Sequence, residues 1–374
     1  MSAIPAASAV KLGGASEVAR RPRTFDAADL TGLIGAALSA AAIVWLIYYR
    51  LTPLGGALGF WLLWFIAFLG LHWLIVRERE GALAANDKVM ASVVTGGALL
   101  VIGPLALILG YVIVRGIGAL TPTFFTQTLE TVGPLSDATE GGALHSIVGT
   151  LQQVGIAVAI SVPLGVMTAV FLNEIGGRMA RPVRMFVDAM SGVPSIVAGL
   201  FIYSVVIIQL GGSFSGFAAG LALSVLMLPT VTRTSEEVLR LVPDGLREAS
   251  LALGAPEWRT TWQVVLPTAR AGLVTAVILG VARAIGETAP LIMTSFGAKV
   301  LNTNPFSGAQ DSLPLFVFQL IQSPQEAQID RAWTGALVLI ALVLILFIAA
   351  RILGGNRSLN RKSRLRRTRK ESAT

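Results

Sequence analysis

Two residues of opposite charge stand inside an apolar stretch of the chain. In "GVARAIGETAPL", residues 280–291, Arg283 and Glu287 are four positions apart, and Thr288 follows. Residues four apart on a helix share a face, so a helical stretch here would let the two side chains pair. A guanidinium is well suited to bind an oxyanion, because its planar fork matches phosphate and carboxylate geometry.

The residues alone leave two interpretations of this pair open. Arg283 and Glu287 can form a structural ion pair that orients their helix. They can also form a polar station on a translocation route, where Arg283 meets an anion while Glu287 holds the guanidinium in place or supplies a repulsive or proton-linked gate. A charge near mid-bilayer costs roughly 2.5–3.5 kcal/mol on insertion scales, so such residues usually face a helix bundle or an aqueous path.

The elements that would position this pair are membrane-spanning helices. The chain has 374 residues, of which 54% are hydrophobic and only 13% charged, whereas a soluble domain carries about 25% charged residues. Its apolar residues come in blocks long enough to cross a bilayer, which takes ~20 helical residues. We therefore predict an all-α polytopic membrane protein with about eight spans. They are 30–49, 57–76, 90–114, one within 144–173, two sharing 189–232 with a break at Gly211–Gly212, 269–296, and 332–350.

Several kinds of chemistry are absent from the sequence. There is no cysteine and there are two histidines, so disulfides, thiolate catalysis, and Cys- or His-rich metal sites are not expected. No Ser/His/Asp set or pair of catalytic carboxylates stands out, which argues against a membrane enzyme. The chain has no Gly-x-x-x-x-Gly-Lys-Ser/Thr loop, so it is not expected to bind ATP or to carry a cofactor itself.

The net charge of +8 is explained by membrane orientation. Lys and Arg gather at 178–184, at 233–259 and in the tail after Leu353, while 116–142 has none. Short cytoplasmic loops retain basic residues, so the sequence predicts both termini in the cytoplasm and makes nucleic-acid binding a poor explanation. The basic tail can also contact anionic membrane lipid.

The polar segment 233–267 is the only sizeable cytoplasmic loop that the sequence predicts. We expect a short helical piece at 236–241 and a second at 245–253, with Asp244 as its N-cap. Gly254 suits the left-handed residue that closes a helix, and Pro256 suits the first turn of another. Helices this short are marginal in isolation, so the segment must dock on something.

This segment resembles the permease subunits of ABC importers. Their pattern is Glu-Ala-Ala, three residues, Gly, nine residues, Ile-x-Leu-Pro. Here it reads Glu248-Ala249-Ser250, then Gly254, then 264–267 as "VVLP". The spacing is kept, and Ser250 and Val264 replace Ala and Ile. The resemblance implies that this segment forms a coupling helix seated in a groove of a cytoplasmic ATPase.

The stretch that carries Arg283 is similar to the PstA-type permeases of phosphate importers, as are "FLNEIGG" at 171–177 and "SGVPSIVAGLF" at 191–201. The resemblance covers about 143–350 and implies a type I importer permease with a six-span core. The expected domains are a cytoplasmic tail at 1–28, two extra spans and a linker at 29–88, the core at 89–352 with its coupling loop at 233–267, and a basic tail at 353–374.

A glycine and a proline inside a predicted span have two possible interpretations. Gly192 and Pro194 lie inside a predicted span, where proline removes a backbone hydrogen bond. They mark either a packing kink or a hinge that opens the path. Asp188 is expected at the membrane interface, and His145 is expected to be a satisfied polar group rather than a ligand.

The sequence thus predicts one permease half of an ATP-driven phosphate importer in the bacterial inner membrane. The resemblance implies a second, PstC-like permease, two PstB-like ATPase subunits that bind ATP, and a PstS-like phosphate-binding protein. The alternatives are an ABC permease for another oxyanion, such as sulfate or molybdate, and an anion transporter or channel without an ATPase. An internal repeat of spans, expected of a secondary transporter, is not evident.

Overall fold

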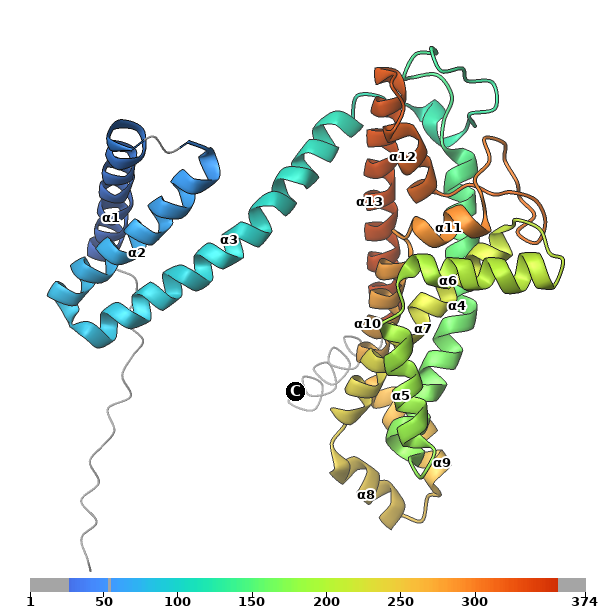
Figure 1. Ribbon diagram of the computed structural model, residues 1–374. Helices are drawn as coiled ribbons and strands as arrows, with labels where there is room; N and C mark the ends of the chain where they lie inside the picture. Colours follow the sequence, from blue (N-terminus) through green and yellow to red (C-terminus); the bar gives the residue numbers. More distant parts are fainter. Residues whose placement is uncertain (1–26, 53–54, 356–374) are drawn as a thin grey trace, which may run out of the picture. The chain divides into compact units, whose positions relative to one another are not determined.

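The computed structural model describes residues 27–52 and 55–355, and helices form nearly all of its regular structure (Figure 1). The predicted tails at 1–28 and 353–374 lie almost entirely outside the described residues. The chain divides into two compact units, Met1–Ala106 and Leu107–Thr374, and each is described by itself. The domain boundaries expected from the sequence remain a prediction.

The first unit is built around a helical pair. Helix α1 (Ala27–Leu46) ends in the π-helical turn η1 (Ile47–Leu51), and α2 (Ala57–Glu80) returns against it. Ala36 and Ala40 are fully buried against Phe68, and the Trp64 indole nitrogen donates to the carbonyl of Ala37 at 3.0 Å. Small residues at the contact let the two backbones approach closely, which is how helices associate in a bilayer.

Charged residues join the ends of this unit's helices. Helix α3 (Ala82–Gly116) begins in this unit and carries Lys88 near its start. The Lys88 ammonium lies 2.6 Å from the Asp29 carboxylate of α1 and 2.8 Å from that of Glu80 in α2. One cation therefore bridges all three helices.

The second unit begins with the end of α3 and an irregular segment. Tyr111 packs against Trp333 with ring centroids 4.9 Å apart. Residues 117–143 then form loops and the short 3₁₀ helix η2 (Pro122–Phe125). Buried Arg331 donates to the carbonyls of Ser136, Asp137 and Glu140, so one side chain fixes the shape of this loop.

The remaining elements form a bundle of long helices with short helices at its two ends. In chain order they are α4 (Leu144–Val170), η3 (Phe171–Ile175), α5 (Ala180–Ser191), α6 (Ser195–Ile202), η4 (Tyr203–Gln209), α7 (Gly216–Arg240), α8 (Asp244–Ala252), α9 (Glu257–Thr260), η5 (Thr261–Val265), α10 (Leu266–Ala284), α11 (Ala289–Thr294), α12 (Leu313–Ile321) and α13 (Glu326–Gly355). Figure 1 shows α8 at one end of this unit and segment 117–143 at the other.

Helix α7 is the central element of the bundle, and glycines allow its neighbours to reach it. A Cβ added at Gly220 would lie 2.6 Å from Ile156 of α4. A Cβ at Gly165 of α4 would lie 3.0 Å from Val231, and one at Gly280 of α10 would lie 2.7 Å from the same residue. These contacts require residues without side chains, because backbones this close leave no room for a methyl group.

The membrane class predicted from the sequence is confirmed. Among the described residues, seven helices are long and apolar enough to cross a membrane. The count reaches eight if the bent pair formed by 180–191 and 195–209 is one span. The predicted break at Gly211–Gly212 is also present, because η4 ends at Gln209, α7 begins at Gly216, and Gly211 has φ +67°.

Two local predictions were wrong. The expected span 269–296 is not one helix, since α10 ends at Ala284 and the short α11 begins at Ala289. The piece expected at 236–241 is mostly the last turn of α7 rather than a separate helix. Between the predicted spans 269–296 and 332–350, the structure has the apolar helix α12, whose nine residues are too few to cross a membrane.

Candidate functional site

Arg283 and Glu287 do not share a helix face. Arg283 lies in the last turn of α10, whereas Glu287 lies in the connection to α11. The Arg283 guanidinium is exposed in this chain, and its Nη1 donates to the Thr230 hydroxyl of α7 at 3.3 Å. The prediction of an i,i+4 helical pair was therefore wrong, because the helix ends between the two residues.

The connection after α10 brings Glu287 and Thr288 to the foot of α11. Both residues are half-buried. Thr288 is the residue before α11, and its carbonyl accepts from the amides of Leu291 and Ile292 at 3.1 and 3.2 Å. Pro290 is in the first turn of α11, where its missing N–H leaves no helical bond unmade. Glu287 and Thr288 thus lie at the break between α10 and α11.

A cluster of arginines around one carboxylate was missed by the sequence analysis. Glu236 of α7 is 1% exposed. Its carboxylate oxygens lie 2.6 Å from Arg184, 3.2 Å from Arg233 and 2.6 Å from Arg240. Arg233 also forms an ion pair with Asp188 of α5. Three arginines thus surround the two carboxylates of Glu236 and Asp188, and the cluster joins α5 to α7. On α7, Glu236 lies six residues after Thr230, the partner of Arg283. The one sequence signal was the spacing of Arg233, Glu236 and Arg240 at i, i+3 and i+7 on one helix.

The Gly192–Pro194 segment is a sharp break rather than a kink inside a helix. The helical segments on either side of it, 180–191 and 195–209, are bent by 104°. Gly192 is the C-cap that follows α5, and Pro194 precedes α6 with φ −59° and ψ 141°. Pro194 costs no helical hydrogen bond at this position. Beyond the break, α6 packs on α11 so closely that a Cβ at Gly199 would lie 2.6 Å from Pro290.

Helix α8 carries the predicted coupling residues on an open surface. No residue of α8 is fully buried, and Glu248 and Ala249 are exposed. Leu246 and Leu251 are 42% and 45% exposed. The predicted N-cap is off by one position, because Asp244 is the first residue of α8 and Pro243 precedes it. Leu246 and Leu251 therefore leave part of the apolar surface of α8 open to solvent.

Ser250 and Gly254, the other two predicted coupling residues, have clear local roles. The Ser250 hydroxyl lies 2.8 Å from that of Thr260 in α9, so the polar group that replaces the usual alanine has a partner. Gly254 has φ +82°, the left-handed conformation expected at the end of a helix. Pro256 precedes α9 rather than lying in its first turn.

Arg247 fastens α8 to the bundle. Its Nη2 and Nε bond the Glu174 carboxylate of η3 at 2.9 and 3.1 Å. The same guanidinium donates to the carbonyls of Leu239 and Val242 and to Asp244. The hydrogen bond to Glu174 raises the pKa of Arg247 above its ordinary value, although burial opposes the shift. Glu174 belongs to "FLNEIGG", so this contact gives that motif a structural role.

A second polar cluster lies toward the opposite end of the bundle. Asp311, in the connection between α11 and α12, accepts from the Ser146 hydroxyl of α4 at 2.5 Å and lies 3.5 Å from His145 Nε2. The Thr150 hydroxyl accepts from the amide of Leu313 at 2.8 Å. Burial raises the pKa of Asp311 to about 7. His145 is thus a buried polar group with one close partner at Nε2, but its Nδ1 has no hydrogen-bond partner among the described residues, so the prediction of a satisfied polar group is met only at one nitrogen.

The chain matches a known protein family over these elements. The family described as "Binding-protein-dependent transport system inner membrane component" matches residues 161–358, which is more than half of the chain and includes α8, Arg283 and the Glu236 cluster. The chain belongs to this family. It is a permease, the multi-pass membrane component of an ABC importer that works with partner subunits.

Curated relatives make the similarity more specific. The chain is 46% identical to "Phosphate transport system permease protein PstA 1" of Mycobacterium tuberculosis (strain H37Rv) over 249 residues, which are 66% of this chain and 80% of that protein. It is 44% identical over 247 residues to PstA of Mycobacterium leprae, covering 66% of this chain and 81% of that protein. The solved MetNI methionine ABC transporter contains a similar chain, with 23% identity, a TM-score of 0.46, and coverage of 57% of this chain and 92% of that one.

Proposed function

We propose that this chain is a transmembrane permease subunit of an ATP-driven importer of inorganic phosphate. The observation that carries the proposal is the 46% identity, over 249 residues, to a protein named as a phosphate transport permease. The 249 residues aligned to that protein are close in number to the residues of the predicted core at 89–352. The two leading spans at 29–88 precede this core.

The proposed coupling surface is α8, with Glu248, Ala249, Ser250 and Gly254. Two PstB-like ATPase subunits would bind ATP, and the groove of one of them would receive α8. The exposed Leu246 and Leu251 favour such docking, because their burial would contribute roughly 25 cal/mol per Å² of apolar surface. Through Arg247 and Glu174, movement of α8 would reach α4 directly.

The proposed path for phosphate passes Arg283, Glu287 and Thr288. A second, PstC-like permease would complete the path and cover the face on which Arg283 is exposed. Arg283 has no carboxylate partner among the described residues, and such a guanidinium keeps donors available for an oxyanion. Arg283 bonds a neutral hydroxyl at 3.3 Å and not Glu287, which favours the pathway interpretation over the structural ion pair. Glu287 would then act at the break beside the anion rather than by holding Arg283.

The orientation in the bacterial inner membrane follows the basic residues. With α8 and the Glu236 cluster in or near the cytoplasm, both termini would be cytoplasmic, and segment 117–143 would face a PstS-like phosphate-binding protein. The break at Gly192–Pro194 would serve as a hinge between α5 and α6. Because the chain bends by 104° there, a small backbone rotation at Gly192 and Pro194 would move α6 together with α11, against which it packs.

The test is purification of this chain after coexpression with candidate ATPase and permease partners, followed by ATPase assay in lipid with the matching binding protein. We expect a stable complex whose ATP hydrolysis rises with phosphate and not with sulfate or molybdate. Stimulation by sulfate or molybdate alone would make it a permease for that oxyanion. Anion transport by the chain without any ATPase would favour a secondary transporter or channel.

A further inference from the structure

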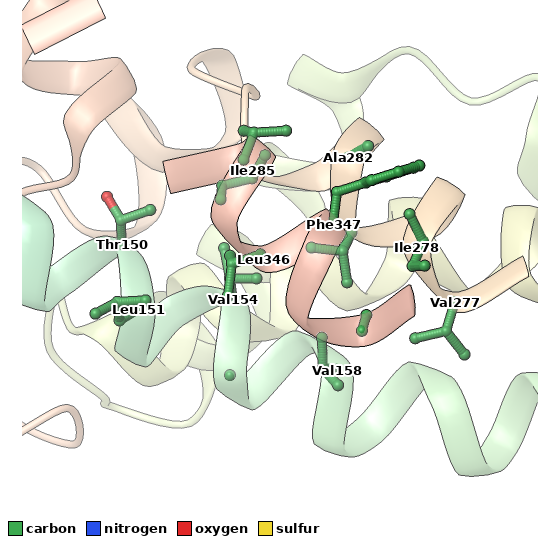
Figure 2. A pocket seen from close by; sticks show the side chains of 14 residues that line it. Thr150, Leu151, Val154, Val158, Val277, Ile278, Ala282, Ile285, Leu346 and Phe347 are labelled. Carbon is green, nitrogen blue, oxygen red and sulfur yellow. The ribbon is translucent and has the colours of Figure 1, made fainter. Parts of the chain in front are cut away.

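An apolar groove runs between α4, α10 and α13, and the proposed function does not use it. Figure 2 shows side chains from the three helices converging on it, with Val154 and Val158 on one side and Val277, Ile278 and Leu346 on others. The groove has a volume of about 280 Å³. All three helices belong to candidate membrane spans, so the groove lies at the depth of lipid chains.

The lining of the groove excludes a polar ligand. Thirteen of its fourteen residues are apolar or glycine, and the exception is Thr150. The Thr150 hydroxyl already donates to the carbonyl of Ser146 at 2.7 Å and accepts from the amide of Leu313 at 2.8 Å. Ordered water needs two to four polar partners, so neither water nor a polar solute finds partners in this groove.

One end of the groove is next to a cation. Ala350 lines the end of the groove on the α8 side, and the exposed Arg351 follows it. Helix α10 runs beside α13 there, because a Cβ on Gly354 would lie 2.7 Å from Val274. An arginine at the end of a membrane span extends toward the headgroup layer, where it attracts anionic lipid. At the opposite end, the lining residues Thr150, Leu151 and Ile285 are uncharged.

We infer that this groove binds one acyl chain of an anionic phospholipid from the leaflet on the α8 side, with Arg351 contacting the headgroup phosphate. The apolar lining accounts for the chain, and the position of Arg351 accounts for the leaflet and the charge of the lipid. Arg283 does not line the groove, although its neighbours Ala282 and Ile285 do, and lipid labelling can be measured whichever anion the protein transports.

Gly155 provides a way to fill the groove without disturbing the fold. It lines the groove, and a Cβ added there meets no heavy atom within 4 Å. Gly155→Leu therefore places a side chain in the space proposed for lipid. Gly97→Leu is the matched control, because Gly97 lies in spanning helix α3 and an added Cβ also meets open space.

The experiment uses the assembled complex in bilayers that contain either phosphatidylglycerol or phosphatidylcholine with a photoreactive acyl chain. We expect phosphatidylglycerol to label groove peptides of α10 and α13 several-fold more than phosphatidylcholine does. Gly155→Leu should lower this labelling several-fold, and Gly97→Leu should leave it unchanged. Arg351→Gln should remove the preference for phosphatidylglycerol while labelling by both lipids continues.

Two results would overturn the proposal. One is equal labelling of the groove in the Gly155→Leu variant and the unchanged protein. The other is efficient cross-linking of Val158→Cys, which gives this cysteine-free chain a single thiol, to a partner subunit. That result would mean that a protein segment, rather than lipid, covers the groove.

Discussion

Arg247 on α8 and Glu174 in η3, the turn that continues α4, are 73 positions apart in the chain, yet Nη2 of the arginine lies 2.9 Å from Oε1 of the glutamate. Both side chains are largely buried, with exposed fractions of 19% and 9%. This pair connects the exposed helix that bears the permease motif to a membrane-spanning helix.

Breaking this pair should uncouple the importer. We expect Arg247→Gln to lower phosphate uptake several-fold while the complex keeps ATPase activity, because α8 can then move without moving α4. A hydrogen bond to a charged group contributes about 1.5–3 kcal/mol when its partner is buried. The measurement is phosphate transported per ATP hydrolysed in proteoliposomes. The double variant Arg247→Glu with Glu174→Arg should restore part of this ratio, and an unchanged ratio in Arg247→Gln would contradict the role.

Arg283 should require its guanidinium and not only its charge. We expect Arg283→Lys to lower uptake strongly, because an ammonium keeps the charge but lacks the planar fork. Arg283→Ala should lower uptake at least as much. Arg178→Ala, an exposed arginine outside the cluster, is the control and should transport normally. Uptake unchanged by Arg283→Ala would return the residue to a structural role.

Ser250 should tolerate replacement by the alanine that the motif usually carries. The hydroxyl pairs with Thr260 at 2.8 Å. Thr260 is buried, but Ser250 is half-exposed, so water can take the place of the Ser250 hydroxyl at a small cost. We expect Ser250→Ala to change phosphate-stimulated ATPase activity by less than about twofold, or ~0.4 kcal/mol. A several-fold rise in coupling would show that the hydroxyl restricts ATPase docking.

Helix packing at Gly220 should not accept a methyl group. A Cβ there would lie 2.6 Å from Ile156 and 3.1 Å from the carbonyl of Gln153. Overpacking of this kind costs about 1–3 kcal/mol, so Gly220→Ala should lower the melting temperature of the purified complex. Gly155→Ala makes the same change on the opposing helix in open space, and it should be neutral or stabilising. Equal effects of the two variants would contradict the close contact between α4 and α7.

Asp311 should make stability depend on pH. Burial raises its folded-state pKa to about 7, and its surroundings are Ser146 and His145 of α4 together with Gln319 of α12 near Gly297. A raised carboxyl pKa favours folding at low pH. That contribution is lost as pH rises from about 4 to about 7, and it totals a few kcal/mol at most, since one pKa unit corresponds to about 1.4 kcal/mol.

The comparison variant is Asp311→Asn, which keeps an acceptor for Ser146 but does not titrate. We expect the melting temperature of the unchanged complex to fall, relative to that of Asp311→Asn, between pH 5 and pH 7. Parallel melting curves for the two proteins across this range would show that Asp311 stays ionised in the folded chain.

The sequence by itself determined the membrane class, the positions of most spans and the motif on α8. These features follow from local composition and fixed spacing: a run of apolar residues is a span wherever it packs, and Gly254 adopts a left-handed turn because few other residues can. The break at Gly211–Gly212 was predictable for the same reason.

The tertiary structure decided which charged residues meet. Arg283 and Glu287 are close in sequence, but α10 ends between them, because the favourable position of Pro290 is the first turn of a new helix. Glu236 with Arg184, Asp311 with Ser146, and Arg247 with Glu174 pair across 52, 165 and 73 positions. A single sequence carries no signal for such pairs, since they depend on how α4, α5 and α7 pack through glycines that lie far apart in the chain.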